Sequence, residues 1–214
     1  VTFSTTVNTF DEVLNKGTEA HIGEAVEFIK ELRARGGTDI HEALQTALTL
    51  IDESADESSK RPKIIVFLTD GRPTVGLTEY QDILKKARKK NTRQNRIFMF
   101  GVGYDVNTHL LDALAEQSKA ASAYIEPFED LELIVSAFFD KIDAPVLSDL
   151  EMKLSGAGIY DVFPKDLPDL FKGSQLLLVG RYRNPGEEYR LTLSGLVDEK
   201  EKVFKYEIDL PRSD

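Results

Sequence analysis

The sequence contains no cysteine among its 214 residues. Disulfide bonds and thiolate zinc sites are therefore excluded, and cysteine usage does not indicate a redox compartment. No run of 18 or more apolar residues is present, so no membrane-spanning helix is expected. Residues 1–10 also lack the basic region and apolar stretch of a secretion signal. The chain opens in what we interpret as the middle of a strand, and we expect it to be a fragment.

Basic residues are in the minority, with 27 Lys and Arg against 37 Asp and Glu, which gives a formal net charge of −10. A surface that binds nucleic acid requires clustered Lys and Arg. The one basic run, residues 85–90, falls on a predicted helix and is interpreted as a solvated face. No nucleic-acid partner is therefore expected. The acidic excess is compatible with a cation-dependent surface, although acidic residues also serve solubility alone.

Short apolar runs alternate with helical periodicity from residue 1 to about residue 144. Residues 63–69 and 96–102 each contain an unbroken apolar run, which is typical of strands buried on both faces of a parallel sheet, and residues 123–125 form a shorter one. Apolar residues at helical spacing predict helices in the ranges 22–32, 40–51, 80–87, 110–115 and 131–142. Residues 1–144 are therefore predicted to form a doubly wound α/β domain with a mostly parallel sheet.

Turn residues separate these elements. At Pro145 the spacing of apolar residues changes from that of helices to that of strands. The first predicted helix stops at residues 36–37 (Gly-Gly), and Thr38 or Asp39 is a suitable N-cap for the next. Residues 54–61 are predicted to form a surface loop. After Pro145, strand patterns at 175–182, 189–193 and 203–208 are separated by turns, of which residues 183–187 are the clearest. Residues 145–214 are therefore predicted to form an antiparallel sheet or a small sandwich.

Two loops carry the most specific motifs of the sequence. Residues 35–40 read Arg-Gly-Gly-Thr-Asp-Ile, and residues 67–76 read Phe-Leu-Thr-Asp-Gly-Arg-Pro-Thr-Val-Gly. At these loops the chain resembles the von Willebrand factor A family. With residues 101–105 and 144–149 added, it resembles the inter-alpha-trypsin inhibitor heavy chains and their bacterial relatives over nearly its whole length. The resemblance implies a Rossmann-like fold, an extracytoplasmic or cell-surface location and a preceding vault-type module.

The resemblance also implies a metal-ion-dependent adhesion site made by three loops. The family supplies an Asp-x-Ser-x-Ser motif after its first strand, a Thr in the second loop and an Asp in the third. By motif match, Thr38 takes the second role and Asp70 the third. Oxygen donors suit hard cations such as Mg²⁺, or Mn²⁺ or Ca²⁺, and open α/β sheets bind ligands at the carboxyl ends of their strands. The family site leaves one coordination position for an acidic side chain of a protein ligand.

The Asp-x-Ser-x-Ser motif is absent from this sequence, together with the family's first strand and helix. Residues 4–6 (Ser-Thr-Thr) lie in what should be the loop after the second strand. A bound cation is therefore expected in the intact protein rather than in this chain alone, because Thr38 and Asp70 supply at most two ligands. The missing strand leaves a gap in the sheet that another strand, a partner chain or an unseen N-terminal segment should fill. The open edge also makes dimerisation plausible.

Each residue of the predicted site has a simpler interpretation as well. Thr38 is a suitable helix cap, and Asp70 with Gly71 is a suitable strand-ending turn. We interpret Asp39 as a capping or outer-sphere residue and Asp105 as a loop carboxylate.

No catalytic motif emerges from the sequence. A strand that ends in Asp70 resembles an aspartate phosphatase loop, but the residue two positions later is Arg72, which cannot act as a general acid near neutral pH. The histidines fall on separate predicted helices without a nucleophile: His21, His41 and His109. We therefore expect a noncatalytic protein-binding or adhesion module. The alternative is a metal-free structural scaffold that packs against an upstream domain of the same polypeptide.

Overall fold

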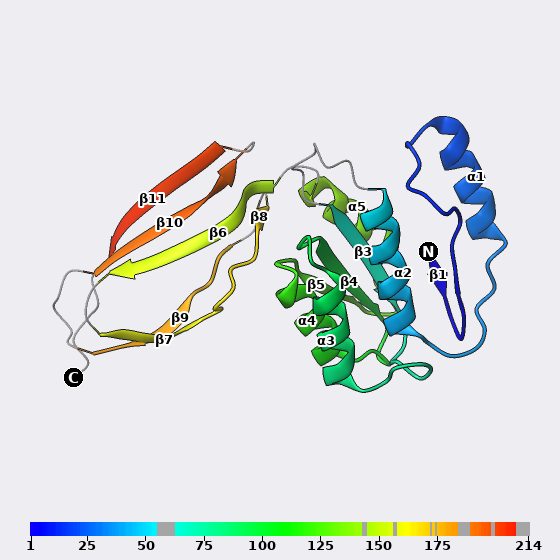
Figure 1. Ribbon diagram of the computed structural model, residues 1–214, viewed down its shortest axis with the longest axis horizontal. Helices are drawn as coiled ribbons and strands as arrows, with labels where there is room; N and C mark the ends of the chain where they lie inside the picture. The colour runs from blue at the N-terminus through cyan, green and yellow to red at the C-terminus, as the bar shows by residue number, and fades with distance from the viewer. Residues whose placement is uncertain are drawn as a thin grey trace. The chain divides into compact units, whose positions relative to one another are not determined.

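A computed structural model describes residues 1–54, 63–142, 145–155, 158–171, 173, 175–183, 189–197 and 200–208. The chain divides into two compact units, Val1–Glu129 and Asp130–Asp214 (Figure 1). Among the helices in these ranges, none combines the length and the apolar character that crossing a membrane requires.

The first unit is built on a parallel sheet with the strand order β3-β4-β5. The strands are β3 (Ile64–Thr69), β4 (Arg96–Val102) and β5 (Ser122–Ile125). The central strand β4 is buried from Arg96 to Gly101, which is the environment that its unbroken apolar run predicts. In a parallel sheet the carboxyl ends of the strands meet at one edge, so the loops after β3 and β4 are neighbours.

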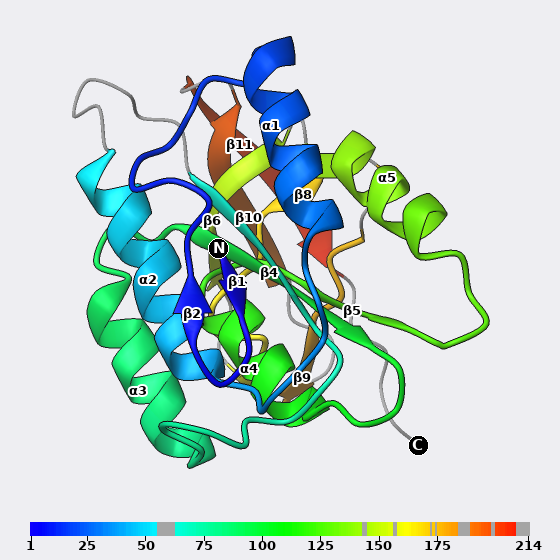
Figure 2. The same cartoon turned by 90° about the vertical axis from the view of Figure 1, so that its right-hand side faces the viewer.

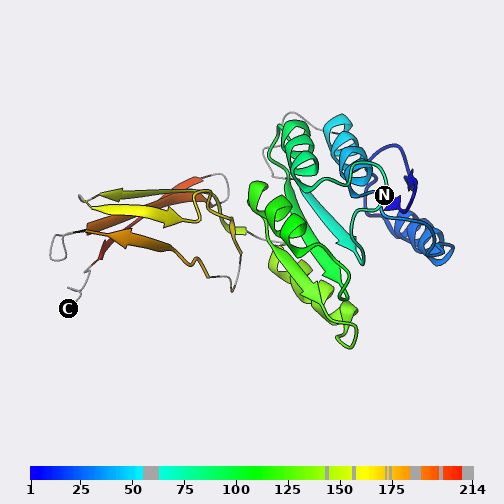
Figure 3. The same ribbon diagram turned by 90° about the horizontal axis from the view of Figure 1, so that it is seen from below.

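Three helices cover one face of this sheet: α2 (Ile40–Glu53), α3 (Tyr80–Lys90) and α4 (Thr108–Gln117). They lie side by side, as Figures 1 and 3 show. Their apolar residues recur at helical spacing and therefore form one stripe that packs on the strands. The fully buried side chains of this core include Ile40, Leu44, Leu48, Ile83, Ile97, Met99, Leu110, Leu111 and Leu114. These helices hold the carboxyl edge of β3 and β4 in place.

The N-terminal residues form a small hairpin and an exposed helix. Strands β1 (Thr2–Phe3) and β2 (Val7–Asn8) pair antiparallel, and the hairpin lies between α2 and α1 (Glu19–Lys30) in Figures 1 and 2. Although α1 carries an apolar stripe, none of its residues is buried, and Ile22 and Ile29 are 54% and 60% exposed.

The predicted stop of α1 at residues 36–37 is wrong by several residues, because the helix ends at Lys30. The guanidinium group of Arg33 donates to the carbonyl oxygens of Lys30 (3.0 Å) and Leu32 (2.9 Å). The bond to Lys30 satisfies one of the carbonyl groups that a helix C-terminus leaves without partners, and the bond to Leu32 holds the backbone that follows the helix.

In its described residues, the second unit contains one helix and two antiparallel sheets, which Figure 1 shows as separate layers. The helix is α5 (Leu131–Ile142). The larger sheet has the order β11-β10-β6-β8 and consists of β6 (Pro145–Ser155), β8 (Leu170–Phe171), β10 (Tyr189–Val197) and β11 (Lys200–Ile208). The smaller sheet pairs β7 (Ile159–Phe163) with β9 (Val179–Tyr182). The hydrophobic core of the second unit includes Leu147, Leu150, Leu167 and Leu193.

The predicted fold class, α/β with a β-rich C-terminal part, is confirmed. The strand predicted at residues 175–182 is shorter than expected, because only Val179–Tyr182 pairs. Most of the predicted loop at 54–61 and most of the predicted turn at 183–187 lie outside the described residues. The compact units divide after Glu129, which assigns α5 to the second unit. The domain boundary expected after residue 144 stays a prediction.

Candidate metal-ion site at the carboxyl edge of the sheet

Asp70 follows β3 directly and is exposed at the carboxyl edge of the sheet. The loop that it begins also touches the loop after β4, because Arg72 Nε lies 3.5 Å from Asp105 Oδ1. Both side chains of this ion pair are mostly exposed, so water screens it and it contributes little to stability. The pair nevertheless places Asp105 on the same edge as Asp70, as a loop carboxylate engaged with arginine.

Thr38 belongs to the loop that leads into α2, and three hydrogen bonds join this loop to the one after β3. The Thr38 N–H donates to Thr74 Oγ1 (2.8 Å), and the N–H groups of Thr74 (3.0 Å) and Val75 (3.4 Å) donate to the Thr38 carbonyl oxygen. Thr38 Oγ1 lies only 3.1 Å from the point where a Cβ on Gly71 would stand. The Thr38 hydroxyl is therefore packed against the residue that follows Asp70, and the structure brings the two predicted ligands into one loop cluster.

The N-cap of α2 is Asp39, one of the two residues that the sequence offers for this role. Its Oδ1 accepts a hydrogen bond from the Glu42 N–H at 3.0 Å. Gly76, at φ +65°, packs against the same carboxylate, which a Cβ at that position would overlap. The Asp39 carboxylate therefore caps the helix, and the Thr38 hydroxyl takes no part in the cap. Within the described part of the chain, neither Thr38 Oγ1 nor the Asp70 carboxylate has a hydrogen-bond partner.

The turn between β1 and β2 supports the Thr38 loop from the other side. Thr5 Oγ1 accepts a hydrogen bond from the Gly37 N–H (2.8 Å), and the Asp39 N–H donates to the Ser4 carbonyl oxygen (2.9 Å). Residues 4–6 thus anchor a neighbouring loop and offer no carboxylate. Sequence reasoning missed Thr5 and Thr74 as supports of the site. Thr74 lies inside the motif at 67–76, but nothing in that motif indicates which group its hydroxyl contacts.

The oxygen donors present are of the type that a divalent cation prefers, but they are few. Thr38 offers a neutral hydroxyl and Asp70 a carboxylate, and both suit hard cations such as Mg²⁺. In the ranges that the structure describes, no group of three or more His, Cys, Asp or Glu residues is placed to hold a metal ion. The residues present therefore fit part of the coordination shell of such an ion, and water or groups from outside the chain must supply the rest.

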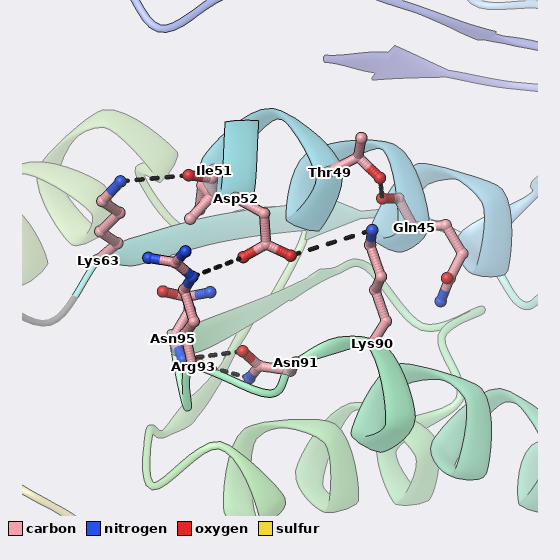
Figure 4. Close-up of polar contacts among 9 residues, drawn as sticks. All are labelled: Gln45, Thr49, Ile51, Asp52, Lys63, Lys90, Asn91, Arg93 and Asn95. Atoms are coloured by element: carbon pink, nitrogen blue, oxygen red, sulfur yellow. Dashed lines mark hydrogen bonds and ion pairs between the residues drawn. The ribbon is translucent and has the colours of Figure 1, made fainter. Parts of the chain in front are cut away.

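A second polar cluster lies at the opposite end of β3 and has a structural role (Figure 4). The Asp52 carboxylate, near the end of α2, lies 4.0 Å from Lys90 Nζ and 3.7 Å from Arg93 Nε. Lys63 Nζ donates to the carbonyl oxygen of Ile51 at 3.2 Å. The cluster thus ties the last turn of α2 to the end of α3 and to the start of β3.

The von Willebrand factor type A domain family matches residues 1–137, which is more than half of the chain. The chain therefore belongs to the von Willebrand factor type A family. Domains of this family are in general adhesion or binding modules rather than enzymes.

Among curated proteins, the chain is similar to inter alpha-trypsin inhibitor, heavy chain 4 of Mus musculus, with 28% identity over 100% of this chain and 23% of that protein. It is also similar to inter-alpha-trypsin inhibitor heavy chain H2 of Mesocricetus auratus, with 28% identity over 85% of this chain and 20% of that protein. The chain thus spans a fifth to a quarter of the length of these relatives.

A solved structure, von Willebrand factor type A from Catenulispora acidiphila, shares the fold. Its TM-score is 0.60 at 19% sequence identity, and the match covers 92% of this chain and 52% of that one.

Proposed function

We propose that the first unit is a noncatalytic protein-binding module whose binding site is the loop cluster of Thr38 and Asp70. One observation carries this proposal: a hydroxyl and a carboxylate lie in adjoining loops without a described hydrogen-bond partner, while the backbone N–H and C=O groups of Thr38 are paired. Asp70 is exposed and Thr38 half-buried. A hydroxyl and a carboxylate that reach solvent and make no bond with a described residue are available to a ligand.

The ligand that these groups favour is a divalent cation such as Mg²⁺, shared with an acidic side chain of a partner protein. Thr38 Oγ1 and the Asp70 carboxylate would supply two oxygen ligands, and residues outside this chain would complete the shell. The cation, when bound, supplies the positive charge that attracts a carboxylate. Without it, an acidic ligand would meet Asp70 and Asp105, whose like charges repel it.

The composition of the loops supports a noncatalytic role. Residues 35–39, 70–76 and 101–105 contain no His, Cys or Ser, so they do not pair a common nucleophile with a histidine base. Binding is the chemistry that their oxygen donors and backbone groups favour.

The proposal is tested by cation binding. A strand that ends in Asp-x-Ser-x-Ser is joined ahead of residue 1, and thermal unfolding of this polypeptide is followed as Mg²⁺ or Mn²⁺ is added. Because a cation that binds only the folded state stabilises it, saturation at a free concentration about 100 times the Kd should add about 2.7 kcal/mol to the free energy of unfolding.

Two substitutions make this experiment specific. Asp70→Asn removes the charged ligand at nearly constant size and should abolish the cation-dependent shift. Asp105→Asn makes the same change on the same edge, in a carboxylate engaged by Arg72, and should preserve the shift. Equal effects of the two variants, or no shift before substitution, would contradict the proposal. Turnover of phosphoesters by the polypeptide would contradict the noncatalytic role.

A further inference from the structure

The second half of α3 is basic in a chain that is otherwise strongly acidic. Between residues 80 and 93 there are six Lys or Arg and one Asp, whereas the whole chain has a formal net charge of −10. Two of the six cations, Lys90 and Arg93, lie against the Asp52 carboxylate (Figure 4). The other four form what we call the basic face of α3: Lys85, Lys86, Arg88 and Lys89.

The basic face is open to solvent and has no counter-charge in the fold. All four of its residues are exposed, while Ile83 and Ala87 on the other side of the helix are buried in the core. Within the described residues, none of the four side chains forms an ion pair or a hydrogen bond. Their charges are therefore available to an anion from outside the chain.

The needs of the helix do not explain this arrangement. Cations in the last turn offset the negative end of the helix dipole, but Lys85 and Lys86 lie more than one turn before the C-cap Asn91 and gain little from it. Like charges three or four residues apart, such as those of Lys85 and Lys89, destabilise a helix. A face that serves solubility alone would mix both signs of charge. A bound polyanion would instead relieve the repulsion.

The chemistry of the basic face limits the kind of polyanion that fits. Every exposed residue of α3 is polar or charged, whereas the centre of an interface between folded proteins is apolar and poor in lysine. Single-stranded nucleic acids stack their bases on aromatic side chains, and α3 exposes none. A disordered acidic peptide would lose conformational freedom on binding, but stiff sugar rings hold their charged groups in place beforehand. Runs of Lys and Arg of this length are also typical of heparin-binding patches.

We propose that the basic face of α3 binds a linear sulfated polysaccharide. Lys85 and Lys89 are about 6 Å apart along the helix axis, so one polysaccharide chain that lies along the helix can contact both. The guanidinium group of Arg88 lies on the same face and can donate two hydrogen bonds to one sulfate group.

This site is separate from the cation site proposed above. The basic half of α3 adjoins the end of α2, because Lys90 of α3 pairs with Asp52. The end of α2 in turn adjoins the start of β3, where Lys63 Nζ donates to the Ile51 carbonyl oxygen. Asp70 follows the other end of β3. Polysaccharide binding therefore requires no metal ion.

The test measures binding of a fluorescently labelled heparin octasaccharide to the 214-residue chain by fluorescence anisotropy, without divalent cations. Because the attraction is between charges and releases counter-ions, the affinity should fall at least about tenfold when NaCl is raised from about 50 mM to about 300 mM. The same oligosaccharide without its sulfate groups should not bind. Absence of heparin binding at the lower salt concentration, or binding that salt does not weaken, would overturn the proposal.

Two matched double variants locate the site. Lys85→Gln with Lys89→Gln removes two charges from the basic face and should lower the affinity at least about tenfold. Lys200→Gln with Lys202→Gln removes two exposed charges from β11 and should change the affinity less than about twofold. Thermal unfolding checks that both variants fold, and the Tm of the first should not fall, because like charges are removed.

Two further comparisons separate charge from helix structure and one polyanion from another. Lys85→Arg with Lys89→Arg keeps both charges and should keep the binding, whereas its loss would mean that charge on this face is not the cause. Equal losses in the two glutamine variants would overturn the proposal. Polyglutamate or a DNA duplex that binds as tightly as the octasaccharide at the same salt concentration would also overturn it.

Discussion

At the scale of single residues, two threonines in the site have opposite roles although their side chains are the same. Thr74 Oγ1 accepts the hydrogen bond of the Thr38 N–H. The hydroxyl of Thr38 makes no such bond with a described residue and lies against Gly71. One hydroxyl therefore stabilises the loops, and the other is available for a ligand.

Thr74→Val should lower the free energy of unfolding by about 1 kcal/mol, because it removes the acceptor of a backbone N–H. Thr38→Val makes the same chemical change in the residue that is hydrogen-bonded to Thr74. It should lower the free energy of unfolding by less than about 0.5 kcal/mol, since the Thr38 hydroxyl makes no described hydrogen bond. Urea denaturation of the two variants and the parent chain measures both effects. Equal losses would mean that the Thr38 hydroxyl is a structural group.

Tyr124 provides a pH-dependent contribution to stability. Burial first, and then the hydrogen bond that its hydroxyl donates to Asp112, raise the pKa of Tyr124 from 10.0 to about 12. The folded state therefore holds this proton more tightly than the unfolded state does. The contribution is complete below pH 10 and is lost as the pH rises from 10 to about 12.

Tyr124→Phe removes the ionisable group, so the variant should lose less stability than the parent chain over that interval. Chemical denaturation at several pH values between 9 and 12 measures the difference. Parallel pH profiles of the two proteins would show that the environment of Tyr124 does not favour its neutral form.

At the scale of elements, the start of α2 depends on one carboxylate. Asp39→Ala should lower the free energy of unfolding by about 1 kcal/mol, because the Glu42 N–H loses its acceptor. Asp39→Asn retains a capping oxygen and should stay close to the parent chain. If both variants lose the same amount, the charge of Asp39 rather than its hydrogen bond supports the helix.

Sequence periodicity predicts the elements of the first unit well because most of them bury one face in a common core. It fails in the second unit, where residues 175–178 were expected to be strand. Leu176 and Leu178 do pack against the core there, but their backbone does not pair. Apolar spacing reports which side chains are buried, and it cannot tell whether the backbone between them has a neighbour. Strands β7 and β8 were missed for a different reason, because they are short and their exposed or half-buried residues give no strong apolar spacing.

The sequence also predicted only part of the candidate site. The motifs identify Thr38 and Asp70, and the topology explains why their loops lie at one edge. The bond between Thr38 and Thr74 joins residues 36 positions apart, and no local pattern encodes a contact that forms only when the chain has folded.

At the scale of the whole molecule, the place of α5 decides where the α/β domain ends. The sequence predicts that the α/β domain extends to about residue 144 and includes α5, whereas the compact units divide after Glu129. A chain that ends at residue 144 should therefore unfold at a higher urea concentration than one that ends at residue 129. Equal midpoints for the two truncated chains would assign α5 to the β-rich part.

The two bonds between Thr38 and Thr74 also have a mechanical consequence. A ligand bound at Asp70 and pulled away from the sheet would load the turn after β3. Both bonds share this load with a longer one, from the Val75 N–H to the Thr38 carbonyl oxygen (3.4 Å), and all three must break before the loops separate. Because Asp39 begins α2 directly after Thr38, tension on the binding loops passes into the helix layer as well as along β3. The loop cluster is therefore built to resist traction as a single anchor.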